Sequence, residues 1–262
     1  MSLIAEERKQ EILGLLEMQK KVRVSDLAEQ LNVSAETVRR HLDDLEHQNK
    51  LKKVYGGAVP VPADNELPHY ERESIHIREK RIIGRLAAEQ VLDNDIIVID
   101  EGSTPLQMIP FLTDKKNLTI MTCSIPALNR LIEYVRRAEI DARVLFIGGE
   151  VSVDHLRISG PVAESMMDDF YVNKAFIATD GVDINHGITS FDLNKALFTR
   201  KLIDQAERTY ILADQSKIGS RTYVKMSKMD DVYAIISEKG EPDSWVSSMQ
   251  DKMTKWLSPD SV

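Results

Sequence analysis

The chain has 262 residues, 42% of them hydrophobic, and its 42 acidic and 34 basic side chains give it a formal net charge of -8. This length and composition can bury a real core in one or two domains, which excludes disordered and disulfide-scaffold proteins. The single cysteine, Cys123, cannot form an internal disulfide, and the charged start of the chain lacks the apolar region of an export signal. Apolar runs are far shorter than the ~20 residues of a membrane helix, so we expect a cytoplasmic protein that does not enter a membrane.

The first 59 residues are predicted to form a small helical module. After a first helix with apolar residues at helical spacing, residues 22–24 are expected to be extended, and Ser25 is expected to cap a second helix. Asn32 and Val33 form a turn, and Ser34 can cap a third helix. Two helices joined by a short turn are therefore expected between residues 25 and 48.

The third helix has one apolar and one polar face. Its apolar residues follow an i, i+4, i+7 pattern and are predicted to face the core; they are Val38, Leu42 and Leu45. The remaining positions are predicted to lie largely outside; they include Thr37, Arg40, His41 and Asp44. An exposed helix face that carries arginine is therefore expected.

A basic hairpin is predicted to follow, because residues 51–55 have strand character and Gly56–Gly57 is a turn signal. This order of elements is typical of a winged helix-turn-helix, whose second helix enters the major groove of double-stranded DNA. Arginine can bind guanine with two hydrogen bonds, whereas lysine suits phosphates. The candidate DNA contacts are Ser34, Thr37, Arg39, Arg40, Lys52 and Lys53. The alternative is a plain helical hairpin whose arginines are only solvated.

Prolines at positions 60, 62 and 68 predict a linker over residues 60–69, between a DNA-binding domain of residues 1–59 and a domain of residues 70–262. The second domain begins with an amphipathic segment, residues 70–92, that is expected to be helical. Strand-like runs then alternate with helical patterns, at residues 96–99, 118–121, 143–147, 174–178, 209–213 and 232–236. This alternation predicts an α/β domain with a mainly parallel sheet. Residues 238–262 are expected to form a terminal helix.

Polar residues and glycines follow most of these strands. Ligands bind at the carboxyl ends of parallel strands, where the free amides of helix starts favour an anion such as phosphate. Asp100 and Asp180, which follow two of the strands, could accept hydrogen bonds from sugar hydroxyls. A phosphorylated sugar satisfies both features and is the expected ligand.

Two parts of the sequence resemble the DeoR family of bacterial regulators of sugar metabolism. The first is VSDLAEQLNVSAETVRRHLDDLEHQNKLKKVYGGAV, and the second comprises ERE, DEGST, MTCS, GGE, SGP, NKAFIATDG and ADQSKIG. The resemblance implies a repressor whose C-terminal domain senses a sugar phosphate and is similar in fold to ribose-5-phosphate isomerase. The effector site of the family maps to Asp100, Gly102, Ser103, Thr104, Thr122, Ser124, Gly148, Gly149, Asp180, Gly181 and Lys217, and Arg200 matches a basic position in the next helix.

The sequence also bears on assembly and on rival functions. A helix-turn-helix module usually reads half-sites in symmetric pairs, so a homo-oligomer, dimer or tetramer, is expected.

The likeness to an isomerase leaves a sugar-phosphate isomerase-like enzyme with an appended DNA-binding domain as the alternative. In the corresponding segment Asp180 and Asp183 remain but Ile184 replaces a carboxylate, and the glycine-rich segment before the isomerase's catalytic glutamate has no match. The histidines show no metal spacing, so no catalytic residue, metal or cofactor is expected.

Overall fold

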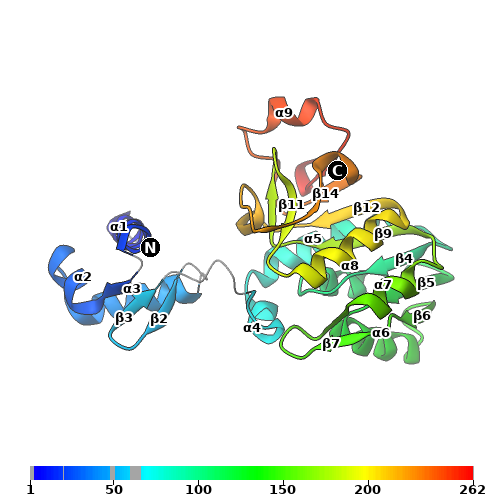
Figure 1. The fold of residues 1–262 in the computed structure, drawn as a ribbon, viewed down its shortest axis with the longest axis horizontal. Coiled ribbons are helices and arrows are strands. Elements are labelled where there is room, and N and C mark those ends of the chain that lie inside the picture. The colour runs from blue at the N-terminus through cyan, green and yellow to red at the C-terminus, as the bar shows by residue number, and fades with distance from the viewer. Residues whose placement is uncertain (1–2, 20, 48–50, 60–65, 262) are drawn as a thin grey trace. The chain divides into compact units, whose positions relative to one another are not determined.

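The computed structural model describes residues 3–19, 21–47, 51–59 and 66–261, and it divides into two compact units, Met1–Asn65 and Glu66–Val262 (Figure 1). Residues 60–65, in the predicted linker, lie outside the described residues, and residues 66–69 are part of the second unit. The elements of the first unit are α1 (Leu3–Gln19), β1 (Val22–Arg23), α2 (Val24–Gln30), α3 (Ala35–His47), β2 (Lys52–Val54) and β3 (Gly57–Val59). This is the predicted winged helix-turn-helix order.

The helices of the first unit pack around one hydrophobic core. Val38, Leu42 and Leu45 of α3 are completely buried, as their spacing predicts. The predicted exposure of His41 is wrong, because only 3% of this residue is exposed. The reason is that α1 packs along this side of α3, where the ammonium of Lys9 lies 2.9 Å from the carboxylate of Asp44.

The two predicted caps have different outcomes. Ser34 caps α3, because its hydroxyl accepts a hydrogen bond from the backbone N–H of Thr37 at 3.1 Å. The prediction for Ser25 is wrong: β1 passes directly into α2 at Val24, and the Ser25 hydroxyl donates to the side chain of Asp26 instead.

The wing is a three-stranded antiparallel sheet in the order β1-β3-β2. Gly56, with φ +75°, makes the tight turn between β2 and β3. A Cβ atom at Gly57 would lie 2.0 Å from the carbonyl oxygen of Val22. Glycine at this position therefore allows β3 to pair closely with β1. This pairing joins the hairpin to the strand that lies between α1 and α2.

The second unit is built on a seven-stranded parallel sheet in the order β15-β14-β12-β9-β4-β5-β6 (Figure 1). Its strands are β4 (Ile96–Ile99), β5 (Leu118–Thr122), β6 (Ala142–Phe146), β9 (Val172–Ala178), β12 (Ala206–Leu212), β14 (Ala234–Ile236) and β15 (Lys255–Leu257). The smaller sheets contain β7 (Glu150–Ser152) with β8 (Arg157–Ser159), and β10 (Gly181–Asp183), β11 (Gly187–Ser190) and β13 (Val224–Ser227). The predicted α/β fold class is confirmed.

Helices cover both faces of this sheet. The α-helices are α4 (His69–Ser74), α5 (Ile77–Glu89), α6 (Ile125–Arg136), α7 (Pro161–Met167), α8 (Leu193–Asp204) and α9 (Val246–Gln250); the 3-10 helices are η1 (Pro105–Phe111), η2 (Gln215–Lys217), η3 (Met229–Asp231) and η4 (Pro259–Ser261). Because side chains alternate along a strand, Ile97 and Ile99 pack with α5, η1 and α6, whereas Val98 packs with α7 and α8. Both faces are buried, which explains the continuous apolar run of β4. Within the described residues no helix is both long and apolar enough to cross a membrane.

In the second unit one predicted helical segment is divided in two, and the prediction for the C-terminal segment is wrong. The amphipathic segment from residue 70 to 92 is two helices, α4 and α5, because His76 takes a left-handed conformation with φ +53° between them. The C-terminal segment is not a long helix: α9 is short, and β15 then pairs in parallel with β14 as the last strand of the sheet. Half-buried Trp256 on β15 packs edge to face with Trp245, at 6.2 Å between ring centroids, and helps to hold this strand.

Candidate functional site

The exposed face of α3 carries the predicted DNA-contacting side chains of the first unit. Arg39 and Arg40 are both exposed, and Arg39 is paired with Glu36 at 3.2 Å. Within the described part of the chain, Arg40 forms no ion pair, so its guanidinium is available to a base edge. The hydroxyls of Ser34 and Thr37 lie 2.9 Å apart at the start of the helix.

The wing places its two lysines differently. Lys52 is exposed, whereas the ammonium of Lys53 contacts Asp43 of α3, and this contact raises the pKa of Lys53. The backbone N–H of Lys53 also donates to Glu46 of α3 at 2.6 Å. Lys53 therefore ties the wing to α3, and Lys52 is the better placed of the two for a phosphate contact. Tyr55 at the turn of the wing is fully exposed.

In the second unit, the predicted ligand residues gather where the strand order reverses. From β4 the chain continues to β5 and β6 on one side, and later to β9, β12 and β14 on the other, so the loops after β4 and β9 diverge between adjacent strands. Such a reversal is the usual ligand site of an open parallel sheet. Asp100 and Glu101 follow β4, and Thr179 and Asp180 follow β9.

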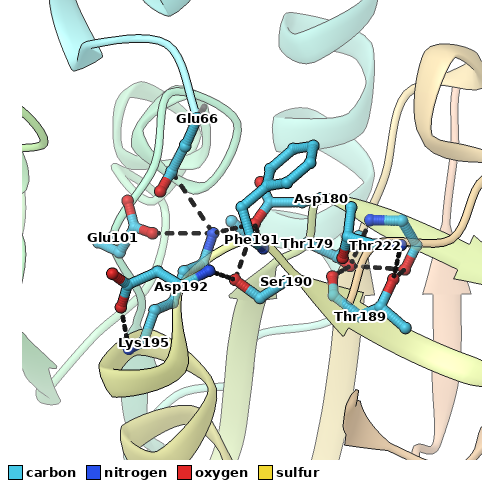
Figure 2. Close-up of polar contacts among 12 residues, drawn as sticks. Glu66, Glu101, Thr179, Asp180, Thr189, Ser190, Phe191, Asp192, Lys195 and Thr222 are labelled. Atoms are coloured by element: carbon cyan, nitrogen blue, oxygen red, sulfur yellow. Dashed lines mark hydrogen bonds and ion pairs between the residues drawn. The ribbon is translucent and has the colours of Figure 1, made fainter. Parts of the chain in front are cut away.

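Asp180 is held by the start of α8 (Figure 2). Its carboxylate accepts hydrogen bonds from the Ser190 hydroxyl at 2.8 Å, the Phe191 backbone N–H at 3.2 Å and the Lys195 ammonium at 3.2 Å. Burial alone would raise the pKa of Asp180, but the charges of Lys195 and Lys217 outweigh burial and lower it. Asp180 is therefore an ionised acceptor, as the expected contact with a sugar hydroxyl requires.

Asp180 is part of a larger group of ion pairs, most of them buried, which we call the charge cluster. Its members are Glu66, Arg72, Glu101, Arg157, Asp180, Asp192 and Lys195. Figure 2 shows Glu66, Glu101, Asp192 and Lys195 converging from separate parts of the chain. Glu101 lies 3.0 Å from Lys195 and 3.5 Å from Arg157. Burial would raise the pKa of Glu101, but the two cations lower it well below its ordinary value.

Asp100 differs from its neighbour in ionisation. It is fully buried, it accepts hydrogen bonds from the Ala178 backbone N–H at 3.2 Å and the Cys123 thiol at 3.5 Å, and burial together with the Glu101 charge raises its pKa to about 7. Burial and the same two carboxylates raise the pKa of Cys123 well above its ordinary value. Cys123 is therefore a buried thiol rather than an activated nucleophile.

The other predicted effector residues occupy several places around the same edge. Gly102, with φ +117°, and buried Ser103 and Thr104 lead into η1; Thr122 ends β5, and Ser124 caps α6; Gly148 and Gly149 follow β6; Gly181 begins β10; and Lys217 ends η2. Arg200 is exposed on α8 and donates a hydrogen bond to the backbone carbonyl of Lys225. Among the described residues, Arg200 makes no hydrogen bond or ion pair with a member of the charge cluster.

Six of the seven members of the charge cluster are missing from the residues that the sequence predicts: Glu66, Arg72, Glu101, Arg157, Asp192 and Lys195. The nearest signals in the sequence are the ERE segment, which contains Arg72, and the DEGST segment, which contains Glu101. Glu66 and Arg157 are 91 residues apart in the chain and meet at 2.7 Å, so no local pattern links them. Among the described residues, no group of three or more histidine, cysteine, aspartate or glutamate side chains could hold a metal ion.

The raised pKa of Asp100 predicts a pH-dependent gain in stability on Asp100→Asn. The folded protein binds this proton more tightly than the unfolded chain, so the stabilisation by the neutral form is complete below about pH 4 and is lost as the pH rises through about 7. The asparagine variant is expected to match the natural protein near pH 4 and to exceed it above pH 7 by a few kcal/mol, on the order of 1.4 per unit of pKa. Urea unfolding at several pH values measures this difference. Exposed Asp114→Asn is the control, and a difference that is constant with pH would contradict the prediction.

Comparisons with known proteins agree with this architecture. Residues 8–62 match the family model of the DeoR-like helix-turn-helix domain, and residues 75–239 match that of the DeoR C terminal sensor domain. The chain is 32% identical over 254 residues to the uncharacterized HTH-type transcriptional regulator YulB of Bacillus subtilis, with 97% of this chain and 96% of that protein covered. It is 27% identical to the glycerol-3-phosphate regulon repressor of Escherichia coli, with 92% and 93% covered.

A solved ribose 5-phosphate isomerase from Neisseria gonorrhoeae shares 22% identity over 54% of this chain and 53% of its own, with a TM-score of 0.37, which is too low to support an argument about activity. The relatives that match nearly the whole chain are named regulators, not enzymes, in agreement with the expectation from the sequence. The two family models cover both units of the structure. The chain belongs to the DeoR family of HTH-type transcriptional regulators.

Proposed function

We propose that this protein is a repressor of a carbohydrate-utilisation operon and that a phosphorylated sugar, bound to the second unit, controls its affinity for operator DNA. The observation that carries the proposal is the exposed arginine face of α3 beside the wing, in a chain whose second unit gathers polar groups at the strand reversal. The names of two relatives support it: a glycerol-3-phosphate regulon repressor and a lactose phosphotransferase system repressor. We also propose that it acts in the cytoplasm as a homo-oligomer, without a cofactor.

Roles for the DNA-contacting residues follow from their exposure. Arg40 reads a base edge in the major groove, with Thr37 beside it, and Arg39 and Lys52 contact phosphates. Ser34 sets the start of α3, and Lys53 holds the wing in place through Asp43. Because the phosphate contacts release counterions, binding is expected to weaken steeply with salt.

The effector site is proposed at the carboxyl edge of the sheet. Asp180 accepts hydrogen bonds from sugar hydroxyls there, and Lys217 and the backbone amides near Gly102 and Ser124 add positive potential around the phosphate. To change DNA binding, the sugar phosphate must bind two conformations of the protein unequally. A coupling free energy of about 1–3 kcal/mol, typical of allosteric proteins, changes operator affinity roughly 5- to 150-fold.

Fluorescence anisotropy tests the proposal directly. The purified protein is titrated onto labelled DNA from upstream of its own operon and onto scrambled DNA, with and without a panel of sugar phosphates. Preferential binding to the upstream DNA that one sugar phosphate shifts is the expected result. Equal binding to both DNAs at low salt would overturn the proposal, and isomerase assays on the same panel would then test the alternative.

Lys217→Ala is expected to keep operator affinity but to reduce the response to the effector. Lys217 lies close enough to Asp180 to lower the pKa of that carboxyl, and its ammonium supplies positive charge for a phosphate. The effector concentration at half response is expected to rise at least tenfold in the anisotropy assay. Lys225→Ala, which removes an exposed lysine on β13, is the control. An unchanged midpoint for Lys217→Ala would remove this residue from the site.

A further inference from the structure

Glu66 is the first residue of the second unit, and its carboxylate is surrounded by cations. It lies 2.7 Å from Arg72, 2.7 Å from Arg157 and 3.7 Å from Lys195, and only 4% of its side chain is exposed. These three cations come from α4, β8 and α8, so a carboxylate from the start of the unit joins three separate elements. Glu66 is buried with the strand-end carboxylates Glu101 and Asp180.

Several polar atoms of Glu66 and of the arginines around it have no hydrogen-bond partner. Within the described residues, Nε and Nη2 of Arg72 and Nε of Arg157 are buried without a hydrogen-bond acceptor. Because the Arg157 side chain is only 3% exposed, water has little access to it. Glu66 Oε1, close to Arg72, also makes no hydrogen bond of good geometry. Buried N–H groups without acceptors are costly, because they have lost water without gaining a partner. The guanidinium groups therefore have unused donors that a single carboxylate does not satisfy.

We propose that Arg72, Arg157 and Lys195 form a binding site for a phosphate monoester, that Glu66 occupies this site as a tethered carboxylate, and that the phosphate displaces it. A phosphate monoester has three terminal oxygens against the two of a carboxylate, and arginine binds phosphate through paired N–H donors. It can therefore accept from the donors that Glu66 leaves without partners. The identification of this phosphate with that of a sugar rests on the function proposed above.

The surrounding charges allow this exchange. Lys80 donates to the backbone carbonyl of Arg72 at 2.6 Å, and Lys217 lies near both Lys80 and Asp180. Without Glu66, the basic groups around the site are Arg72, Lys80, Arg157, Lys195 and Lys217, and the acidic groups are Glu101, Asp180, Asp192 and Asp214, together with partly ionised Asp100. Without Glu66, five cations therefore face four ionised carboxylates and part of a fifth, and this excess of positive charge favours an anion in its place.

The position of Glu66 in the chain gives the exchange a consequence. The first unit ends at Asn65, and Glu66 is the residue through which the chain enters the second unit. When phosphate takes its place, Glu66 leaves the charge cluster. The first residue of the second unit that contacts hold in place then lies closer to α4. A ligand in the second unit thus acts on the segment that leads to the DNA-binding unit. Glu66 is a positioning residue in this scheme.

Calorimetric titration of the full chain tests the exchange. Inorganic phosphate and glucose 6-phosphate are the probes, and glucose is the uncharged control. Glu66→Gln removes the competing charge, so we expect it to bind phosphate at least tenfold more tightly than the natural protein. Glu71→Gln, which removes an exposed carboxylate from α4, is the matched control and should bind as the natural protein does. Equal phosphate affinity in Glu66→Gln and the natural protein, or no binding to either, would overturn the proposal.

The cations and the fold of the variants are tested in parallel. Arg157→Gln and Arg72→Gln are expected to lose phosphate binding, and Arg72, with 15% of its side chain exposed, is the substitution better tolerated by the fold. Glu66→Asp keeps the charge but shortens the side chain, so an intermediate gain in affinity is expected if Glu66→Gln does not fold. Tighter binding of glucose 6-phosphate than of inorganic phosphate would show that the sugar contributes contacts of its own.

Proteolysis of the natural protein detects the displaced residue. A glutamate-specific protease cuts the Glu66–Leu67 bond only when the Glu66 carboxylate is out of the cluster. We expect glucose 6-phosphate or phosphate to accelerate this cut several-fold relative to the cut after exposed Glu139, as followed by mass spectrometry. A cut that the ligand slows or leaves unchanged would contradict displacement. Neither experiment contains DNA, so their failure would leave the repressor proposal standing, and a failure of operator binding would leave the Glu66 exchange standing.

Discussion

Arg40→Ala is expected to abolish most of the preference for operator DNA. A bidentate arginine contact with guanine contributes about 1–3 kcal/mol of discrimination, so affinity for the operator should fall roughly 5- to 150-fold. Affinity for scrambled DNA should fall far less, because other cations keep their contacts with the phosphates. Anisotropy titrations on the two DNAs, at several salt concentrations, measure both affinities.

The control for Arg40 removes an arginine that is exposed elsewhere. Arg85 on α5 has 71% of its side chain exposed and pairs with Glu89, so Arg85→Ala should leave both affinities unchanged. Lys52→Ala provides a contrast within the wing. It should lower the affinity for operator and scrambled DNA alike, and it should reduce the slope of log affinity against log salt by about 1. If Arg40→Ala lowers the affinity for operator and scrambled DNA equally, Arg40 contacts phosphate and does not read the base sequence.

Lys195→Met is expected to destabilise the second unit by about 3–5 kcal/mol, the usual cost of removing one partner from a buried ion pair. The Lys195 side chain is 2% exposed, and it lies 3.0 Å from Glu101 and 3.2 Å from Asp180. Methionine fills a similar volume but leaves both carboxylates buried near fewer cations. Both tryptophans of the chain, Trp245 and Trp256, lie in the second unit, so their fluorescence during urea unfolding reports its stability.

The same helix supplies the control for Lys195. Lys201 on α8 pairs with Asp168 near the surface at 2.6 Å, and Lys201→Met should change unfolding little, because exposed pairs contribute little. Adding Glu101→Gln to Lys195→Met should recover part of the lost stability, since it removes one of the charges left without compensation. Equal effects of the two lysine substitutions would show that the charge cluster does not hold the unit together.

Local signals in the sequence predicted most of the fold. The spacing of Val38, Leu42 and Leu45 predicted the buried face of α3, the Ser34 hydroxyl predicted its start, and apolar runs predicted six of the parallel strands. These features depend on residues within one turn or one strand, where helix period, capping and β-propensity act. Apart from Arg200 on α8, the predicted effector residues lie around one edge of the sheet, because the carboxyl ends of parallel strands share that edge.

The errors in prediction arose where packing between distant segments overrides local pattern. His41 has a polar side chain on the expected outer face, yet α1 covers it. The terminal segment has no strong strand signal, and β15 forms because the edge of β14 offers free backbone partners and Trp256 packs on Trp245. His76 breaks a continuous helical pattern, and neither proline nor glycine marks the break.

By itself, the sequence determined the winged helix-turn-helix with its exposed arginine and the α/β class of the larger unit, because each depends on periodicity and turn chemistry over a few residues. Only the tertiary structure decided which charges are buried together. Glu66, Glu101, Arg157 and Lys195 are spread over 130 positions of the chain and meet at the strand reversal. A charge is stable away from water only when partners surround it, and those partners come from separate elements that the folded sheet brings into contact.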